Sequence, residues 1–333
     1  MRRRKNRLVH AETFLALLLL FVPSLQLAEK DPDDLLSTFS IVAYDPDNKE
    51  WGVAVQSKFF NAAAIVPWAK AGVGAIATQA FANYSYGPEG LKLLEQGLSA
   101  SEVVKRLTEA DPERDRRQLA VIDARGTVET FTGSKCTPWA GAIKGKYYSA
   151  QGNILVGQQV VQAMGKAFEE TRGDLADRLV AALAAGQAAG GDARGKQSAG
   201  LLVVRAGAGF AGTDRYIDLR VDDHPEPIEE LQRLLRRYRL TLKLYRAFSL
   251  EQEGKITEAI RLVREVVEKD PQDGDVHYRL AALLARTGDK PAALAELEKA
   301  LTLNRPLALL VTHNPAFDSL RNEPAYQKLM AGR

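Results

Sequence analysis

The stretch "TFSIVAYDPDNKEWGVAVQS", residues 38–57, contains two strand-like runs on either side of a polar turn. Residues 38–45 and 51–57 show the composition and alternation of strands, and Pro46, Asp47 and Asn48 supply the turn chemistry between them. The pattern predicts a hairpin that opens a folded domain, with Thr38 at its first position. That position matters chemically, because a threonine that becomes a chain terminus can act as a nucleophile.

Further strand and helix patterns follow in blocks. Strands are expected at 72–80, in a hairpin over 117–133, and in the stretches "LLVVRAG" and "RYIDLRV". A helix is expected over 98–111, where Ser99 and Glu102 have capping-box spacing, and two more over 157–171 and 174–189. Hairpins in place of regular crossovers predict an α+β fold with antiparallel sheets.

The first 28 residues have the composition of a secretory signal peptide. A basic segment, "MRRRKNR", precedes an apolar run over 14–22 that is shorter than the roughly 20 residues needed to span a bilayer. We therefore expect a secreted or periplasmic protein without a stable membrane span. The cleavage position is left open, and residues 29–37 would remain as a linker or propeptide.

Composition narrows the function classes. The 333-residue chain has a formal net charge of +3, and much of that excess lies in the leader, so nothing in the bulk charge indicates nucleic-acid binding. Cys136 is the single cysteine, which excludes an internal disulfide and is typical of a packed thiol.

From residue 227 to residue 333 the pattern becomes continuous helix with an internal repeat. A shift of 34 residues superposes Ala247 on Ala281 and Gly254 on Gly288, and places small residues where helices would cross. This period resembles tetratricopeptide repeats, with two copies and a degenerate third. The basic run over 233–239 is interpreted as a solvated helix face.

Two other motifs are better explained without a cofactor or a metal. Gly207, Gly209 and Gly212 form a GxGxxG pattern, but a strand-like stretch follows where a dinucleotide fold needs a helix. The "VDDH" stretch that ends at His224 is interpreted as a charged turn. No cofactor and no metal site are expected.

Thr38 needs a base to act as a nucleophile. If proteolysis frees its own α-amine, that amine can serve, because its unperturbed pKa is about 7.7–8.0. Such a site also requires a nearby cation and polar donors for an oxyanion. Lys58, directly after the second strand of the hairpin, is the candidate cation.

Several stretches together resemble the domain of unknown function 1028 family, which is assigned to the N-terminal-nucleophile (Ntn) hydrolase superfamily. They lie between residues 38 and 231 and are "TFSIVAYDP", "GVAVQSKFFN", "VPWAKAGVGAIATQAFANYSYGPEGL", "QGNILVG", "DARGKQSAGLLVVR" and "DLRVDDHPEPIEEL". The resemblance implies a four-layer αββα sandwich over residues 38–226 and a nucleophile that cleaves amide bonds.

The resemblance also implies a set of site residues. Thr38 is the nucleophile, Lys58 its charge partner, and Asn153, interpreted as an amide at a tight glycine turn, the oxyanion donor. Polar side chains that would bind the substrate are Thr78, Gln79, Asp192, Arg194, Gln197 and Ser198. Exposure of Thr38 requires a cut at the Ser37–Thr38 bond.

We therefore expect an exported amidohydrolase that acts on a small or peptide-like amide. The repeat tail would recruit a protein partner or support assembly, and the oligomeric state is left open. The alternative is a non-catalytic periplasmic ligand-binding or scaffold protein that acts through its repeats.

Overall fold

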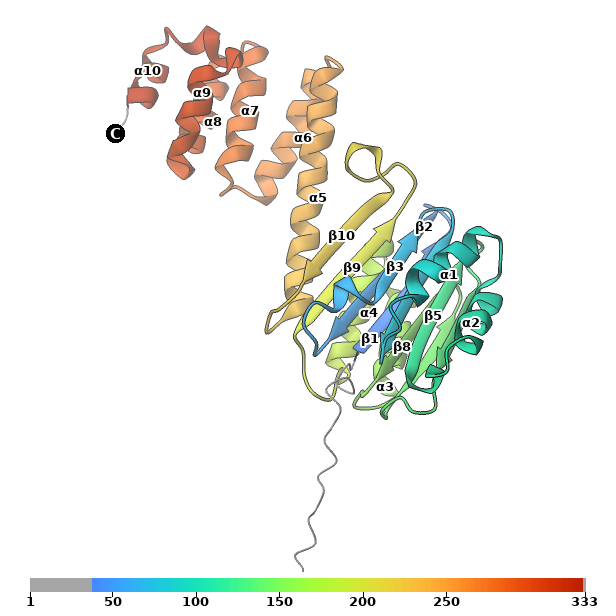
Figure 1. Cartoon of the computed structure of the whole chain (residues 1–333). Coiled ribbons are helices and arrows are strands. Elements are labelled where there is room, and N and C mark those ends of the chain that lie inside the picture. Colours follow the sequence, from blue (N-terminus) through green and yellow to red (C-terminus); the bar gives the residue numbers. More distant parts are fainter. Residues whose placement is uncertain (1–37, 332–333) are drawn as a thin grey trace, which may run out of the picture.

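The computed structural model describes residues 38–331, and the expected signal peptide and linker lie outside them. Ten strands form two antiparallel sheets (Figure 1). The first sheet has the order β10 (Arg215–Val221), β9 (Ser198–Val204), β2 (Glu50–Ser57), β1 (Thr38–Asp45), β8 (Tyr148–Asn153) and β7 (Gly141–Gly145). The second has the order β3 (Pro67–Lys70), β4 (Gly74–Ala80), β5 (Arg117–Asp123) and β6 (Val128–Thr132).

The opening hairpin lies at the centre of the larger sheet. β1 pairs with β2 on one side and with β8 on the other, both antiparallel. The turn between β1 and β2 is held by Asp45, whose carboxylate accepts hydrogen bonds from the backbone of Asp47 and the side chain of Asn48. The sequence prediction of this hairpin is confirmed.

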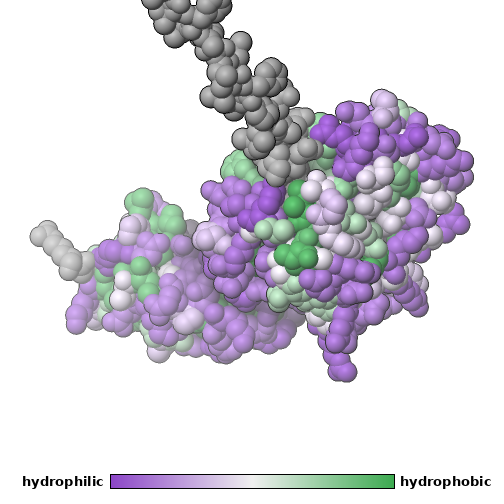
Figure 2. All heavy atoms as spheres, turned by 90° about the horizontal axis from the view of Figure 1, so that it is seen from below, coloured by the Kyte–Doolittle hydropathy of each residue, from purple (hydrophilic) through white to green (hydrophobic). Residues whose placement is uncertain are grey.

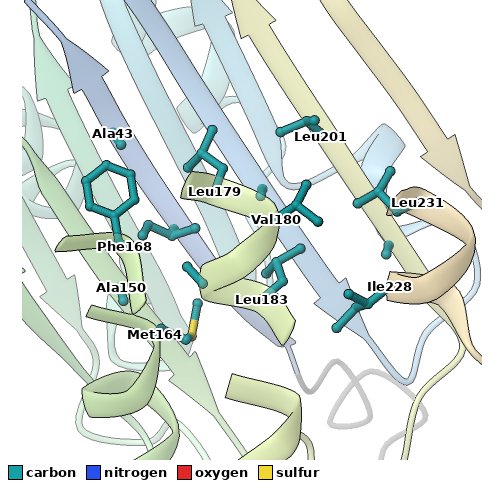
Figure 3. Packing of buried hydrophobic residues seen from close by; sticks show 14 of the residues in the cluster. Ala43, Ala150, Met164, Phe168, Leu179, Val180, Leu183, Leu201, Ile228 and Leu231 are labelled. Carbon is teal, nitrogen blue, oxygen red and sulfur yellow. The ribbon is translucent and has the colours of Figure 1, made fainter. Parts of the chain in front are cut away.

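Alternation along β1 separates two apolar layers. Phe39, Ile41 and Ala43 point toward α3 (Gln159–Glu170) and α4 (Leu175–Ala188), which cover the outer face of the larger sheet. Figure 3 shows Ala43 in this layer with Phe168 and Leu179 from these helices. Val42 points the other way and packs with residues of the smaller sheet such as Ala120. The outer face of the smaller sheet is covered by α1 (Tyr86–Glu95) and α2 (Ala100–Glu109).

The helix and hairpin predictions in this region are confirmed with small shifts at the ends. α2 begins with the expected capping box, in which Ser99 and Glu102 exchange hydrogen bonds. The GxGxxG stretch lies in the connection between β9 and β10, which contains a short 3-10 helix, η4 (Phe210–Gly212), and leads directly into a strand. It therefore lacks the helix that a dinucleotide site would need.

The C-terminal part is helical, as expected. Its elements are α5 (Pro227–Gln252), α6 (Ile256–Lys269), α7 (Gly274–Arg286), α8 (Lys290–Leu303), η5 (Arg305–Leu307), α9 (Ala308–His313), η6 (Pro315–Leu320) and α10 (Pro324–Ala331). The residues that repeat after 34 positions have equivalent roles: Ala247 and Ala281 are fully buried, and Gly254 and Gly288 follow helices with φ of 78° and 82°.

The two hydrophobic cores meet along α5. Its first turns contribute Ile228, Leu231 and Leu235 to the core under α4, and its last turns contribute Ala247 and Leu250 to the repeat core. The boundary between the two cores therefore lies within α5, the helix that begins at residue 227. None of the helices over residues 38–331 combines the length and apolarity of a membrane span.

Candidate functional site

A row of polar side chains crosses one end of the larger sheet. The strand registers pair Thr38 with Ser57 on one side and with Asn153 on the other, and pair Ser57 with Ser198. Val42, Val55 and Leu202 pack between the two sheets. Thr38, Ser57 and Ser198 are each an even number of positions from one of them on the same strand, so the row also faces the smaller sheet. Four adjacent strands thus present a hydroxyl or an amide at the same level.

Thr38 lies in the middle of this row. It is 2% exposed, and its Oγ1 lies 3.1 Å from Ser57 Oγ, in a hydrogen bond in which either hydroxyl can donate. Its backbone carbonyl accepts a hydrogen bond of 3.2 Å from Gln79 Nε2 on β4. The threonine is therefore held through strand pairing on both sides and through an amide from the opposite sheet.

The smaller sheet supplies two buried amides to this end of the inter-sheet space. Gln79 Nε2 donates to Gln118 Oε1 at 2.8 Å, and Asn153 Nδ2 donates to the same oxygen at 3.2 Å. Gln79 Oε1 accepts a hydrogen bond of 2.6 Å from Ser40 Oγ. Gln118 is on β5 and therefore connects three strands from two sheets at one point.

The polar network continues one layer further from the strand ends. Gln151 Nε2 donates to Ala77 O at 3.1 Å and lies 3.4 Å from Ser40 Oγ. Its Oε1 is buried and has no hydrogen-bond partner among residues 38–331. Beyond this layer the inter-sheet space is apolar, so the polar side chains concentrate at the end where β1 starts.

The expected loop residues also gather at this end. Asp192 is buried, and its carboxylate accepts hydrogen bonds from the backbone N–H groups of Lys58 and Arg194, both at 2.9 Å. The Arg194 guanidinium pairs with the same carboxylate at 3.3 Å. Gln197 N–H donates to Ser57 O at 3.0 Å, which fastens the loop to the strand that flanks Thr38.

Ser198 begins β9 and contacts the connection between β2 and β3 on the other side of Ser57. Its Oγ donates to Phe59 O at 2.6 Å and accepts from the backbone N–H of Ala62 at 3.1 Å. These contacts fix the segment that carries the chain from β2 across to the smaller sheet. Ser198 is thus part of the polar row, and its hydroxyl is occupied by backbone partners.

Two expected site residues are placed elsewhere. The Lys58 side chain is exposed, and its ammonium group makes no hydrogen bond or ion pair with the part of the chain that the structure describes, so it does not lie against Thr38 as predicted. Thr78 points away from Gln79, because neighbouring strand residues alternate, and its hydroxyl donates to Asn83 O at 3.4 Å near α1. Only Gln79 of that pair reaches the polar row.

Asn153 is the last residue of β8 instead of part of a tight glycine turn. The residue after it, Ile154, has φ of 51°, which is unusual for a β-branched side chain. Its carbonyl accepts a hydrogen bond of 2.9 Å from the backbone N–H of Ala193, next to Asp192. Backbone strain of this kind is found at functional sites, where surrounding contacts maintain it.

Sequence reasoning missed four members of the network. Ser40, Ser57, Gln118 and Gln151 are all fully buried and all face the inter-sheet space. A signal was present in the spacing, because Thr38 and Ser40 are two residues apart, as are Gln151 and Asn153. Polar residues at period two in otherwise apolar strands indicate one shared polar face.

Other candidate groups offer no competing centre. Burial raises the pKa of the Cys136 thiol to about 11, which makes it a poor nucleophile near neutral pH. His224 Nδ1 accepts a hydrogen bond from Glu226 N–H at 3.0 Å, within the turn before α5. Among the residues that the structure describes, no group of three or more His, Cys, Asp or Glu side chains could hold a metal ion.

Hydrophobic surface borders the point at which the described chain begins (Figure 2). Two of the exposed large hydrophobic residues, Phe60 and Val156, are on segments that continue β2 and β8 beyond Ser57 and Asn153. Their side chains are 58% and 48% exposed. Polar groups and apolar surface thus occur close to the same strand ends.

Comparison with known proteins places this geometry in a family. Residues 38–231 match the family of unknown function DUF1028. The chain belongs to the DUF1028 family. Residues 250–306 of this DUF1028 protein match a tetratricopeptide repeat family, in agreement with the 34-residue period. No curated protein matches the chain.

A solved structure is similar to the DUF1028 domain. Protein SPO2555 from Silicibacter pomeroyi, a DUF1028 protein, shares 32% sequence identity with the chain, with a TM-score of 0.55. The match covers 60% of this chain and 88% of SPO2555. The polar row described above lies within the part of the chain that matches the DUF1028 family.

Proposed function

We propose that this DUF1028 protein is an exported Ntn-type hydrolase that cleaves a carbon–nitrogen amide bond, with Thr38 as its nucleophile. One observation carries the proposal: Thr38 Oγ1 is at the first position of the central strand, beside Ser57 and level with Asn153, in a polar cluster between two sheets. The order of layers, with helices outside two stacked antiparallel sheets, agrees with the αββα sandwich that the superfamily resemblance implies.

The chemistry begins with a cut at the Ser37–Thr38 bond, which frees the α-amine of Thr38. That amine takes the proton from Oγ1 as the oxygen attacks the carbonyl carbon of the substrate amide. The tetrahedral intermediate collapses when the leaving nitrogen receives the proton, and an ester forms on Oγ1. Water then attacks this ester with the amine again as base, which releases the acid and restores the hydroxyl.

The neighbouring groups have separate roles in this scheme. Ser57 Oγ, at 3.1 Å, fixes the position of the attacking hydroxyl. Asn153 Nδ2 is the candidate donor to the oxyanion, because Asn153 is level with Thr38 on the adjacent strand and its nitrogen is turned into the polar cluster by the hydrogen bond that it donates to Gln118. Lys58 stays outside this scheme, since its ammonium group is in solvent.

The test is acylation of a chain that begins at Thr38 by a β-lactone, whose ring opens so that its acyl group is added to Oγ1 without a leaving group. We expect a mass increase on the N-terminal peptide, retained in Thr38→Ser and lost in Thr38→Ala. A matched chain that keeps Ser37 should remain unmodified. Equal labelling of the Thr38→Ala chain, or of the chain that begins at Ser37, would count against the proposal.

A second function is favoured by the repeat region. We propose that the helical tail contacts another protein through the groove of about 470 Å³ between α5 and α7. Tyr245 and Phe248 in its lining are 57% and 48% exposed, and Arg279 lies 5.1 Å from the centre of the Phe248 ring. Large aromatic and arginine side chains are enriched at protein interfaces.

Site-specific photo-crosslinking tests this second function. A photoreactive residue at position 245 should form a discrete adduct in the native host, whereas one at Glu298, on the exposed face of α8, should not. Equal crosslinking from both positions would argue against a specific groove. If the lactone test fails while this one succeeds, the scaffold alternative is favoured.

A further inference from the structure

The Gln118 side chain touches both the Gln79 amide from β4 and the Asn153 amide from β8 beside Thr38. It is fully buried, and it comes from β5, the strand of the smaller sheet that lies beside β4. It makes five hydrogen-bond contacts, of which two are to its amide oxygen and three are from its amide nitrogen. Its Nε2 approaches Thr132 Oγ1, Gly141 O and Gly152 O at 3.1, 3.2 and 2.8 Å.

These contacts determine which way the Gln118 amide points. Two of the three partners of Nε2 are backbone carbonyls, which only accept hydrogen bonds, so the amide nitrogen must occupy that side. The opposite orientation would place two carbonyl oxygens against Gln118 Oε1 in a buried, low-dielectric environment. Gln118 Oε1 must therefore face the polar row.

The orientation of Gln118 then dictates that of its two neighbours. An amide oxygen accepts and cannot donate, so Gln79 and Asn153 must both turn their NH2 groups toward it. With its nitrogen so placed, Gln79 also donates to Thr38 O and accepts from Ser40 Oγ, and all of these contacts are consistent with this orientation. Gln118 thus determines the orientation of two amides, one in each sheet.

We propose that Gln118 is the positioning residue of this site: it holds the Asn153 amide with its nitrogen, and not its oxygen, turned into the polar cluster beside Thr38. This inference deepens the proposed function and rests on it where a reaction rate is concerned. The orientation itself is independent of any reaction. A flipped Asn153 would place its amide oxygen where the developing oxyanion needs a hydrogen-bond donor. The two oxygens would then repel each other.

The rate test is a double-mutant cycle on the chain that begins at Thr38, with β-lactone acylation as the measured step. Gln118→Met should lower the acylation rate about 100-fold, as expected for a misplaced catalytic group. In the Asn153→Ala background the same substitution should change the rate less than about threefold, because the group through which it acts is gone. Equal losses in both backgrounds would overturn the inference.

A spectroscopic test reads the orientation directly on the full chain. The side-chain NH2 signals of Asn153, assigned by their loss in Asn153→Ala, should shift and exchange faster with water in Gln118→Met. Gln56→Met is the matched control, since Gln56 is equally buried but contacts none of these amides, and it should leave the signals in place. Unchanged Asn153 signals in Gln118→Met would refute the positioning role.

Thr132→Val is a milder variant in case Gln118→Met fails to fold. It removes one acceptor of the Gln118 NH2 group at a half-buried position and keeps the side-chain shape. The same signals should shift in the same direction by a smaller amount, and no shift would contradict the inference. If wild-type protein ignores the lactone, the proposed function fails, and the NH2 signals still decide the role of Gln118.

Discussion

Gln56 is a fully buried side chain whose amide nitrogen and oxygen both have no hydrogen-bond partner among residues 38–331. It is on β2 directly before Ser57, but alternation places it on the helix-covered face of the sheet, opposite Phe39. An amide without partners in an apolar layer costs free energy, because it loses its hydrogen bonds to water.

We expect Gln56→Met to raise the free energy of unfolding by about 1–3 kcal/mol, since methionine has a similar size and carries no amide. Urea unfolding of both chains measures the difference. Gln118→Met should have the opposite effect, because the amide of Gln118 is fully bonded. A loss of stability in Gln56→Met would mean that the amide has a partner in solution.

Glu50 lies at the other end of β2 and is 2% exposed. Burial raises the pKa of its carboxyl group to about 7, and the Arg205 guanidinium, 2.8 Å from Oε1, opposes the shift. In the unfolded chain this pKa returns to about 4.5. The unfolded chain therefore releases the proton more readily, and the stability contributed by this group is lost as the pH rises from 4.5 through 7.

Glu50→Gln should remove this pH dependence, which amounts to about 3 kcal/mol over that interval. The measurement is the free energy of unfolding at pH 5 and at pH 8 for both chains. The free energy of unfolding of the variant, relative to that of the wild type, should be higher at pH 8 than at pH 5. Glu89→Gln, at an exposed position on α1, serves as the control, and the same change there would contradict the assignment to Glu50.

At the scale of elements, Asp111 connects α1, α2 and β5. Its Oδ2 accepts hydrogen bonds from Asn83 Nδ2 at 3.0 Å, Tyr86 OH at 2.9 Å and Arg117 Nε at 2.9 Å. Burial by itself would raise the pKa of Asp111, but the hydrogen bonds from Arg117, Asn83 and the Glu113 backbone outweigh it and hold the pKa well below its usual range. The carboxylate thus secures the helical layer to the smaller sheet.

Asp111→Asn should destabilise the protein by about 3 kcal/mol at pH 7, because it removes the buried carboxylate partner of Arg117 and leaves that charge with the more exposed Glu113 carboxylate. The contribution of Asp111 is present above its unfolded pKa of about 3.8 and decreases as the pH falls below that value. The difference in the free energy of unfolding between wild type and variant should therefore be smaller at pH 3 than at pH 7. A constant difference at both values would rule out the charge as the cause.

At the scale of the whole molecule, α5 joins the DUF1028 domain to the repeats. The basic run over 233–239 is exposed at Arg233, Arg236 and Arg237, as expected of a solvated helix face. Two of its arginines also make ion pairs: Arg239 pairs with Asp174 and Asp177 at the start of α4, and Arg237 pairs with Asp270 and Asp273 before α7. The helix also contributes apolar residues to both cores. We infer that the two parts unfold as one unit.

Thr241→Pro tests this coupling, because proline in a helix interior costs about 3 kcal/mol or more and interrupts the hydrogen bonds between the two cores. Calorimetry should resolve one transition for wild type and for Thr241→Ala, and two for Thr241→Pro. Two transitions in the wild type would show that α5 does not couple the cores. The site near Thr38 should keep its lactone reactivity in Thr241→Pro.

Much of the local structure was readable from the sequence. Alternation located β1, β2, β5, β6, β9 and β10, and cap residues located the start of α2. β3, β7 and β8 were not predicted. The side chain of the β8 residue Asn153 was identified as a candidate, but its secondary structure was not.

The candidate site was predicted only in part. At Thr78 the error is explained by the alternation of side chains along a strand. Thr78 and Gln79 were expected to share a cleft, yet adjacent strand residues face opposite sides, so at most one of them could reach Thr38. Gln118 was missed because a glutamine at the start of a strand can equally well face water. Its partners are 35 and 39 residues away, and nothing local marks them.

Short-range patterns were enough to specify the hairpin that opens on Thr38, the helical repeat with its period of 34, and the α+β class, because each depends on residues close together in the chain. The meeting of Thr38, Ser57, Asn153 and Gln118 at one point, the exclusion of Lys58 from it, and the sharing of α5 by two cores depended on how distant strands and helices pack. Strand register and the stacking of layers arise from contacts between remote segments, and a shift of one residue would turn every one of these side chains to the opposite face.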